Sequence, residues 1–267
     1  MLTNWLNHNG GLCVQPGWTE SGVHALFSFR HHPNDREGGL DVAFHSRVSE
    51  DSTLESRQVV ATELGVSLDC FVFVRQVHGA DVAVVDAAHR GLGATKASPN
   101  RMAADALVTN DKNVALAILT ADCVPILFYD PVRKAIGAAH SGWRGTVSHI
   151  SKRVVETMQK TYGTQPEDLL VSIGPSIRIC CYEVDEVVAG PVHREFTEKV
   201  IFPRFNRAGK FWFSMQSAIC SDLLTVGVRD EHIDDTGICT SCRSTHLFSH
   251  RREQGNAGRQ MAAIALT

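Results

Sequence analysis

Several features are missing from this sequence of 267 residues, and each absence argues against a class of protein. The formal net charge is only −3, so no excess of basic residues indicates a nucleic-acid or membrane partner. No window approaches the roughly 18 consecutive apolar residues of a membrane span. The first residues, MLTNWLNHNGGLCVQPGW, lack the basic start and continuous apolar stretch of a secretory signal. We therefore expect a cytoplasmic globular protein.

Internal repeats, low-complexity tracts and linkers are also missing, which predicts a single domain over residues 1–267. No glycine-rich phosphate-binding fingerprint follows the first strand-like segment, so a doubly wound nucleotide-binding sheet is disfavoured. The eight cysteines are scattered through a chain too long to be a small disulfide scaffold, which favours reduced thiols. The sequence specifies no oligomeric state, and a monomer is compatible with it.

The apolar residues follow two periodicities along the chain. Helical spacing predicts helices over 51–66, 146–163 and 214–228, the first with Asp51 or Ser52 as its N-cap and the second ending at Gly163. Apolar, strand-like runs predict strands within 70–86, 114–119, 124–129, 134–139, 169–177 and 255–267, and polar, turn-rich segments predict loops at 29–39 and 89–101. Strands and helices alternate irregularly, with hairpins among them, which favours an α+β domain built on mixed sheets.

One hairpin carries two side chains suited to chemistry. The stretch 118–146, ILTADCVPILFYDPVRKAIGAAHSGWRGT, has a predicted turn at Asp130 and Pro131 between two apolar runs. Counted outward from this turn, Cys123 lies about as far away as His140, so antiparallel pairing places both at the same end of the ladder. Neighbouring strands lie about 4.8 Å apart, which is within reach of two side chains that share one metal ion.

His78 is the third candidate ligand, in VRQVHGADV after another strand-like run. The following Gly79 allows a sharp backbone reversal that would project the imidazole. Two imidazoles and a thiolate suit a catalytic zinc ion, which keeps a fourth position open for water or substrate. The competing interpretation is that Cys123 is a small buried hydrophobe and that His140 is a hydrogen-bonded core residue.

Six blocks of this sequence resemble the signature blocks of the multicopper polyphenol oxidase (laccase)-like family. They are RQVHGADV, ADALVTN, TADCVPILFYDP, AAHSGWRGT, SIGPSIRICCYEV and SHRREQGNAGRQMA. They follow one another over residues 71–183 and 236–264. Family members are also described as purine nucleoside phosphorylases and, in some bacteria, as peptidoglycan-editing factors. The resemblance implies a layered α/β/β/α arrangement and a zinc site carried onto His78, Cys123 and His140.

The resemblance also implies phosphorolysis of adenosine, inosine, guanosine and methylthioadenosine, with adenosine deamination as related chemistry. Deamination needs a proton shuttle, for which Asp122 is the candidate, unless it is an outward surface carboxylate. Phosphorolysis needs a bound phosphate, which suits the planar guanidinium of Arg144, unless that group forms a structural ion pair. Arg75 and Gln76 precede His78 and are candidates for orienting the substrate, but on a regular strand only one of them would face the site.

Three other functions stay open. A cysteine hydrolase acting on a peptidoglycan precursor would use Cys123 as nucleophile and His140 as base. Copper also binds imidazole and thiolate, but a laccase needs several coppers and His-x-His ligands, and this sequence has no such pair. Polyphenol oxidation is therefore expected as secondary behaviour at most. The third alternative is a scaffold or metal-binding module without catalytic activity.

Four further cysteines lie in two short segments, with CC at 180–181 and GICTSC at 237–242. A second zinc site would require these segments to meet in space. No strand-then-helix context follows the second segment, so a thioredoxin-like role lacks support. Reduced cysteines in packed surroundings are the preferred interpretation.

Overall fold

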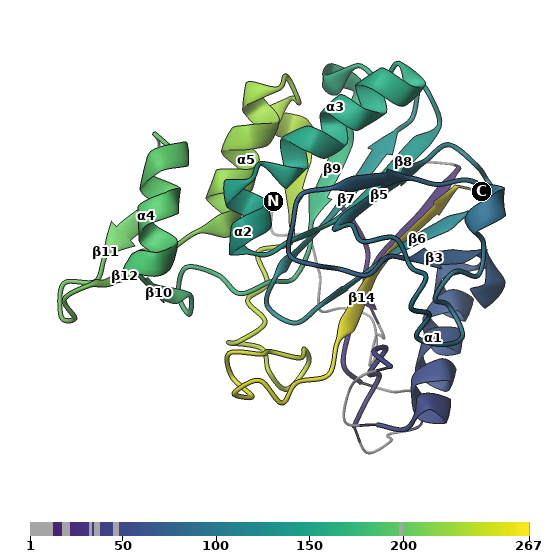
Figure 1. Cartoon of the computed structure of the whole chain (residues 1–267), viewed down its shortest axis with the longest axis horizontal. Helices are drawn as coiled ribbons and strands as arrows, with labels where there is room; N and C mark the ends of the chain where they lie inside the picture. Colours follow the sequence, from purple (N-terminus) through teal and green to yellow (C-terminus); the bar gives the residue numbers. More distant parts are fainter. Residues whose placement is uncertain are drawn as a thin grey trace.

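The computed structural model describes residues 13–17, 22–31, 34, 38–44, 48–197 and 200–266. Most of the opening segment MLTNWLNHNGGLCVQPGW lies outside these ranges, as does part of the loop predicted at 29–39. Two β-sheets pack face to face, and helices cover the outer face of each sheet (Figure 1). This α/β/β/α arrangement confirms the predicted α+β fold with mixed sheets.

The first sheet has five strands. In spatial order they are β1 (Cys13–Val14), β2 (Val23–Ser28), β14 (Gln260–Leu266), β6 (Ala115–Thr120) and β3 (Phe71–Phe73). Only β3 pairs in parallel, with β6. Helix α1 (Glu50–Leu64) packs on the outer face. It begins after Ser49, and not after Asp51 or Ser52 as predicted, because the Ser49 hydroxyl accepts the backbone N–H of Ser52 and caps the first turn.

The second sheet has six strands. In spatial order they are β13 (Ile233–Asp235), β9 (Leu170–Ile173), β7 (Val124–Asp130), β8 (Ala135–Ser141), β5 (Ala106–Thr109) and β4 (Val82–Val84). The two edge strands pair in parallel, and the inner pairs are antiparallel. Helices α3 (Ile150–Tyr162) and α5 (Met215–Thr225) pack on the outer face.

The predicted helix over 146–163 is interrupted. It ends at Gly163 as expected, but His149 has a left-handed backbone with φ of 57°. A left-handed residue cannot continue a right-handed helix, so the segment divides into α2 (Trp143–Val147) and α3. Helix α2 begins close to the end of β8, with Gly142 as its N-cap.

A third, smaller sheet forms a lobe beside the sandwich (Figure 1). In spatial order its strands are β10 (Glu183–Asp185), β12 (Lys210–Phe213) and β11 (Ile201–Pro203). Helix α4 (Glu186–Glu195) contacts all three strands. Short 3₁₀ helices span Leu68–Cys70, Ala87–His89, Pro166–Asp168 and Asp230–His232. No helix among the described residues is both long and apolar enough to span a bilayer.

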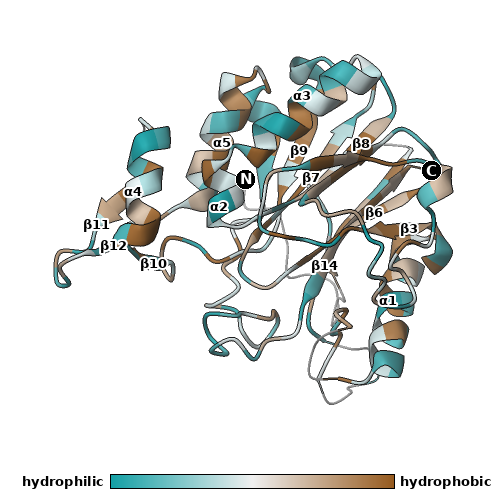
Figure 2. Cartoon of the chain, viewed as in Figure 1, coloured by the Kyte–Doolittle hydropathy of each residue, from teal (hydrophilic) through white to brown (hydrophobic). Residues whose placement is uncertain are grey.

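One apolar core lies between the two main sheets. Leu107, Leu127 and Ile136 of the second sheet meet Leu116 and Ile264 of the first, and all five are fully buried. Strands covered on both faces read as nearly continuous apolar runs, which Figure 2 shows along the sandwich. Each such side chain contributes about 1.5–3 kcal/mol when buried. The site is therefore built at the end of a well-packed sandwich.

The chain passes from the first sheet to the second between β3 and β4, and again between β6 and β7. The segment 70–86 was predicted as strand, tight turn, strand, and it does contain β3 and β4. These two strands do not pair with each other, because they belong to different sheets. The β3–β4 and β6–β7 connections both place side chains at one end of the sandwich, where β8 also ends.

Candidate metal centre

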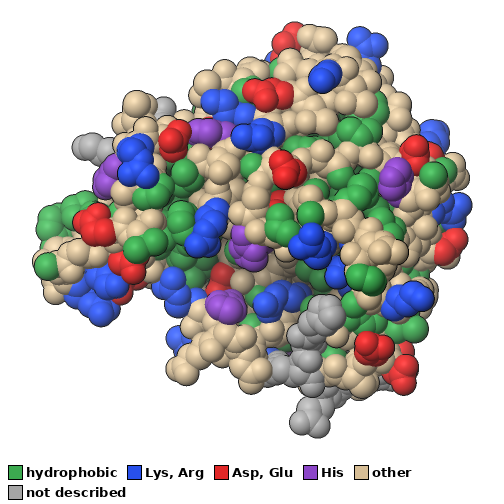
Figure 3. Space-filling model, in the orientation of Figure 1, with side chains coloured by type: hydrophobic (Ala, Val, Ile, Leu, Met, Phe, Trp, Pro, Cys, Tyr) green, Lys and Arg blue, Asp and Glu red, His purple; other side chains and the backbone are tan. Residues whose placement is uncertain are grey.

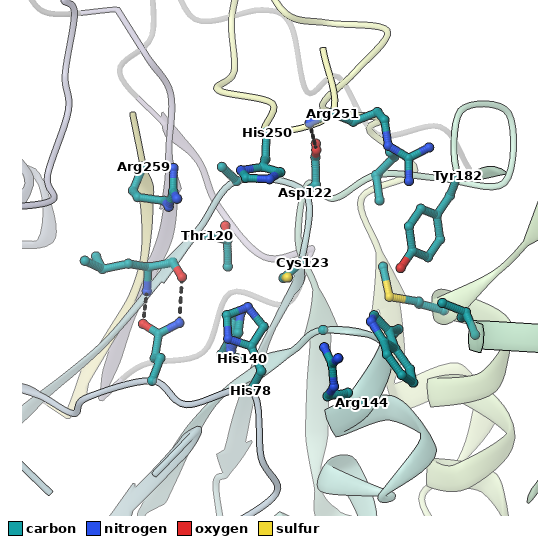
Figure 4. Close-up of a pocket in the computed structure, with 18 of the residues that line it drawn as sticks. His78, Thr120, Asp122, Cys123, His140, Arg144, Tyr182, His250, Arg251 and Arg259 are labelled. Atoms are coloured by element: carbon teal, nitrogen blue, oxygen red, sulfur yellow. Dashed lines mark hydrogen bonds between the residues drawn. The ribbon is translucent and has the colours of Figure 1, made fainter. Parts of the chain in front are cut away.

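His78, Cys123 and His140 meet at this end of the sandwich (Figure 4). Their candidate ligand atoms all lie within 4.8 Å of one another. His78 comes from the β3–β4 crossing, Cys123 from the β6–β7 crossing and His140 from β8. In the β7–β8 ladder Pro125 lies opposite His140 and Val124 lies opposite Ser141, so Cys123 stands just beyond the last pair. The predicted placement of Cys123 and His140 at the same end of one hairpin is confirmed.

The backbone at His78 turns in a different way from the prediction. The left-handed residue is His78 itself, with φ of 60°, and Gly79 does not have a positive φ. A left-handed conformation is uncommon for a residue with a side chain, so it needs support from its surroundings. That support comes from Asp105, whose carboxylate accepts the backbone N–H groups of Val77, His78 and Gly79 at 3.1, 3.0 and 2.6 Å.

Asp105 also orients the second imidazole. Its Oδ1 lies 2.8 Å from Nδ1 of His140, and both side chains are buried. A hydrogen bond at Nδ1 fixes the ring and leaves Nε2 for a metal ion, which is the usual arrangement around ligating histidines. Burial alone would raise the pKa of Asp105, but the hydrogen bonds from His140 and Gly79 hold that pKa below its ordinary value. Asp105 is therefore a carboxylate at neutral pH.

The surroundings of Cys123 favour its thiolate form. Burial raises its pKa, but the charge and hydrogen bond of His140, followed by those of His78, lower the pKa to about 6. Burial in turn lowers the pKa of His140, whereas the Cys123 thiolate and Asp105 raise it to about 9. A soft anionic sulfur beside two imidazoles fits zinc or copper.

Gly142 keeps the ligands close together. A Cβ atom at this position would lie 3.2 Å from Sγ of Cys123 and 3.2 Å from Cδ2 of His78, which is tighter than ordinary contacts. The lack of a side chain at Gly142 thus lets the two crossings approach each other at the end of β8.

The three side chains open into a cavity of about 780 Å³. Figure 3 shows the hollow near the centre of this face, with histidine, lysine and arginine side chains around it. The basic residues that line it are Arg75, Arg101, Arg144, Lys210, Arg251 and Arg259. They face three carboxylates, those of Asp122, Glu183 and Asp185. The excess of positive charge suits an anionic ligand such as phosphate.

All four predicted substrate-binding residues line this cavity. Strand β3 ends at Phe73, so Arg75 and Gln76 are not held in strand alternation and both reach the cavity. The Gln76 side chain pairs with the backbone of Leu119 in both directions, donating from Nε2 at 2.8 Å and accepting at Oε1 at 2.9 Å. Gln76 therefore fixes the end of β6 as well as lining the cavity.

Asp122 is not an outward surface carboxylate, because only 8% of it is exposed. Its two oxygens accept the hydroxyl of Thr240 and the backbone N–H of Arg251, each at 2.6 Å. Arg144 is exposed, and its guanidinium lies 4.2 Å from the centre of the Trp143 ring. Within the described ranges it has no carboxylate partner, so the alternative of a structural ion pair is not supported.

Sequence reasoning did not identify several residues of the cavity. Thr120, Tyr182, His250 and Arg259 line it together with the predicted residues, and Figure 4 shows His250 and Arg259 across the space from His78 and His140. The Oγ1 atom of Thr120 is buried and has no hydrogen-bond partner among the residues that the structure describes. In the sequence, only the basic residues near 251 indicated this wall of the cavity. The other residues could not be assigned to it, because the position of the wall depends on contacts with distant parts of the chain.

The fold and these side chains together define a layered α/β/β/α protein with a His/Cys/His centre in a basic cavity. Residues 24–267 match the family model described as multi-copper polyphenol oxidoreductase laccase, and the chain belongs to this family. The family assignment made from the six sequence blocks is therefore confirmed.

Similar proteins carry names from purine nucleoside metabolism. The purine nucleoside phosphorylase YlmD of Bacillus subtilis is 33% identical over 227 residues, 85% of this chain and 82% of that protein. The adenosine deaminase RL5, from an unknown prokaryotic organism, is 35% identical over 246 residues, 91% of this chain and 94% of that protein. The crystal structure of YlmD from Geobacillus stearothermophilus has a TM-score of 0.89 at 31% identity and covers 98% of both chains.

Proposed function

We propose that this protein is a zinc-dependent enzyme that cleaves adenosine, inosine, guanosine and methylthioadenosine by phosphorolysis and also deaminates adenosine. The main observation behind this proposal is the meeting of His78, Cys123 and His140 in a basic cavity. The names of the similar proteins support purine nucleosides as substrates. In this proposal the whole chain acts as one cytoplasmic domain whose partners are nucleosides and phosphate, with no nucleic acid or membrane.

The donor set fits a catalytic zinc ion. Two imidazoles and one thiolate supply three ligands, and Asp105 orients one of the imidazoles from behind. Zinc bound there would polarise a water molecule or a substrate atom at its fourth position. Copper is the alternative metal, because the same ligands suit it.

The basic residues of the cavity support phosphorolysis. Arg144 and Arg75 line the cavity and form no ion pair with a carboxylate within the described part of the chain, so their charge is available to hold phosphate. In the reaction a phosphate oxygen bonds to C1′ of the ribose while the glycosidic bond breaks and its electron pair leaves with the purine. Trp143 and Tyr182 offer aromatic surface at the cavity wall, and the Thr120 hydroxyl is free to bond the nucleoside.

Deamination places a different demand on the same cavity. The amino group at C6 must leave as ammonia, so a proton has to reach it. Both oxygens of Asp122 already accept short hydrogen bonds, which supports a positioning role for this residue over that of a proton shuttle. His250, across the cavity from the three ligands, is the titratable side chain that we propose for the proton transfer.

Chromatography of reaction mixtures tests the proposal. Zinc-loaded protein is incubated with adenosine or inosine, with and without phosphate, and compared with the Cys123→Ala variant. Free base and ribose 1-phosphate that form only with phosphate indicate phosphorolysis, and inosine formed from adenosine without phosphate indicates deamination. We expect both activities to be lost in the variant. If the zinc-loaded wild type makes none of these products, the proposal is wrong.

A second candidate function is favoured by one observation. Cys123, His140 and Asp105 form a relay in which the carboxylate orients the imidazole and the imidazole lowers the pKa of the thiol. A cysteine hydrolase of peptidoglycan precursors would use such an arrangement, with Cys123 as nucleophile. Its activity would survive a zinc chelator and would stop on alkylation of Cys123, whereas the metal-dependent enzyme would lose activity with the chelator.

A further inference from the structure

Four cysteines outside the cavity come together at one point. Cys180 and Cys181 lie in the turn between β9 and β10, and Cys239 and Cys242 lie in the loop after β13. All four sulfur atoms lie within 4.8 Å of one another. The Sγ of Cys242 is 3.6 Å from that of Cys180 and 3.4 Å from that of Cys181. The two cysteine segments of the sequence therefore do meet in space. The cysteines are free, as in the preferred interpretation, but Cys180 and Cys242 are exposed and do not lie in packed surroundings.

These separations match a metal ion better than a disulfide. A disulfide holds its sulfur atoms about 2.05 Å apart, and all of these cysteines are free. Four sulfurs bound at about 2.3 Å around a tetrahedral zinc ion lie about 3.8 Å from one another. The two Sγ–Sγ distances of 3.4 and 3.6 Å lie just below that separation, and all four sulfur atoms lie within 4.8 Å of one another.

The backbone holds the two segments in place. Ser176 donates its N–H to the carbonyl of Ile238 and accepts the N–H of Thr240, at 3.2 and 3.1 Å, in a parallel bridge. The Sγ of Cys239 in turn accepts backbone N–H groups of Arg178 and Cys242. Backbone N–H groups directed at a cysteine sulfur are the kind of outer contact that orients metal-bound thiolates.

We propose that Cys180, Cys181, Cys239 and Cys242 bind one structural zinc ion. Four thiolates complete the tetrahedral coordination, so this site has no open position for water or substrate, in contrast to the three-ligand centre in the cavity. Each thiol releases its proton to solvent as it coordinates the ion. Thiolates select zinc over harder cations such as magnesium and calcium.

The ion would fix one wall of the cavity. Tyr182, which follows Cys181, lines the cavity, and the guanidinium of Arg251 donates to the carbonyl of Cys181 at 3.4 Å. On the other segment, Thr240 lies between the cysteines of the loop and donates its hydroxyl to Asp122. Zinc at the four cysteines would therefore join the segment that carries Tyr182 to the loop that carries Arg251.

Metal counting tests this site without any assay of activity. The full chain is purified under reducing conditions from zinc-containing medium, and zinc is measured per chain for the wild type and for variants. We expect two zinc ions in the wild type, one in Cys242→Ser, one in Cys123→Ala and none in the double variant. The matched control is Cys70→Ser, which changes a cysteine outside both groups and should keep two ions.

X-ray absorption at the zinc edge identifies the ligands directly. In Cys123→Ala, where the cavity centre is disabled, we expect four sulfur neighbours at about 2.3 Å. This variant keeps all four proposed ligands, so the measurement stands even if Cys242→Ser does not fold. The proposal is overturned if Cys123→Ala binds no zinc, if its zinc has nitrogen or oxygen neighbours, or if Cys242→Ser keeps the zinc content of the wild type. If the cavity centre binds no metal, the wild type holds one ion, and Cys242→Ser still loses it.

Discussion

Replacing Asp105 with asparagine tests how the centre is held together. The carboxylate accepts four hydrogen bonds, with His78 N–H and His140 Nδ1 at one oxygen and the N–H groups of Val77 and Gly79 at the other. An amide can present its oxygen to only one of these pairs, so its NH₂ group faces two donors and leaves them unsatisfied. If the NH₂ group takes the position next to His140, Nδ1 of His140 has no acceptor. The ring then no longer favours the tautomer that leaves Nε2 for the metal ion.

The magnitude follows from these contacts. Loss of a carboxylate behind a ligating histidine typically weakens metal binding by about 10–100-fold, which is about 1.4–2.7 kcal/mol. Two backbone donors without an acceptor cost about 1–3 kcal/mol each when fully buried. Val77 is partly solvated, with 44% of its surface exposed, so we expect a value near the low end, about 2 kcal/mol, for the metal-free protein.

Two assays measure these effects separately. Competition with a chromophoric chelator gives the zinc affinity of Asp105→Asn, and urea unfolding of the metal-free protein gives its free energy of unfolding. The control is Asp111→Asn, since Asp111 accepts the backbone N–H groups of Ala87 and Asn113 in the same way but lies outside the cavity. The control should lose some stability and keep its zinc affinity. Wild-type zinc affinity in Asp105→Asn would refute the role assigned to Asp105.

Three further predictions concern the centre and the cavity. Gly142→Ala should lower zinc affinity about tenfold, because its Cβ displaces Cys123 and His78, and an unchanged affinity in the chelator competition would contradict this. Arg144→Ala should raise the KM for phosphate about 10–100-fold with little change in stability, and Arg144→Lys should be intermediate; equal phosphate kinetics in all three proteins would exclude this contact. In metal-free protein the pKa of Cys123 is lowered to about 6, so iodoacetamide should alkylate it at a rate that rises with pH and levels off above that value, and zinc should protect it. A midpoint near the ordinary thiol pKa of about 8.5 would contradict the thiolate assignment.

The sequence predicted the parts of the site that depend on local pattern. Cys123 and His140 could be placed together because a hairpin with a clear turn fixes which residues face each other. Gly163 ended its helix as expected, since a left-handed glycine cap is a local signal. The layered arrangement came from the resemblance of the sequence blocks. His78 was a candidate because it follows a strand-like run and precedes Gly79, but nothing in its spacing links it to the hairpin, and the resemblance supplied that link.

Features that depend on tertiary contacts could not be predicted. Asp105 lies in a strand-like block, and its role depends on a backbone turn at His78 that the sequence does not reveal. β3 and β4 were expected to pair with each other, but each pairs with a strand from a later part of the chain, β3 with β6 and β4 with β5, and these belong to different sheets. The break at His149 is stabilised by Asp222, which lies 73 residues further along the chain and 2.8 Å from Nδ1. Cys180 and Cys242 are likewise brought together only by the folded chain.

The central claim is that His78, Cys123 and His140 hold one metal ion in the cavity. Anomalous diffraction at the zinc edge from crystals of the zinc-loaded protein tests it most directly. We predict an anomalous peak within about 2.0–2.3 Å of one nitrogen of each imidazole and of the Cys123 sulfur. Density that shows these three side chains without a peak between them, while zinc is bound elsewhere on the protein, would contradict the claim.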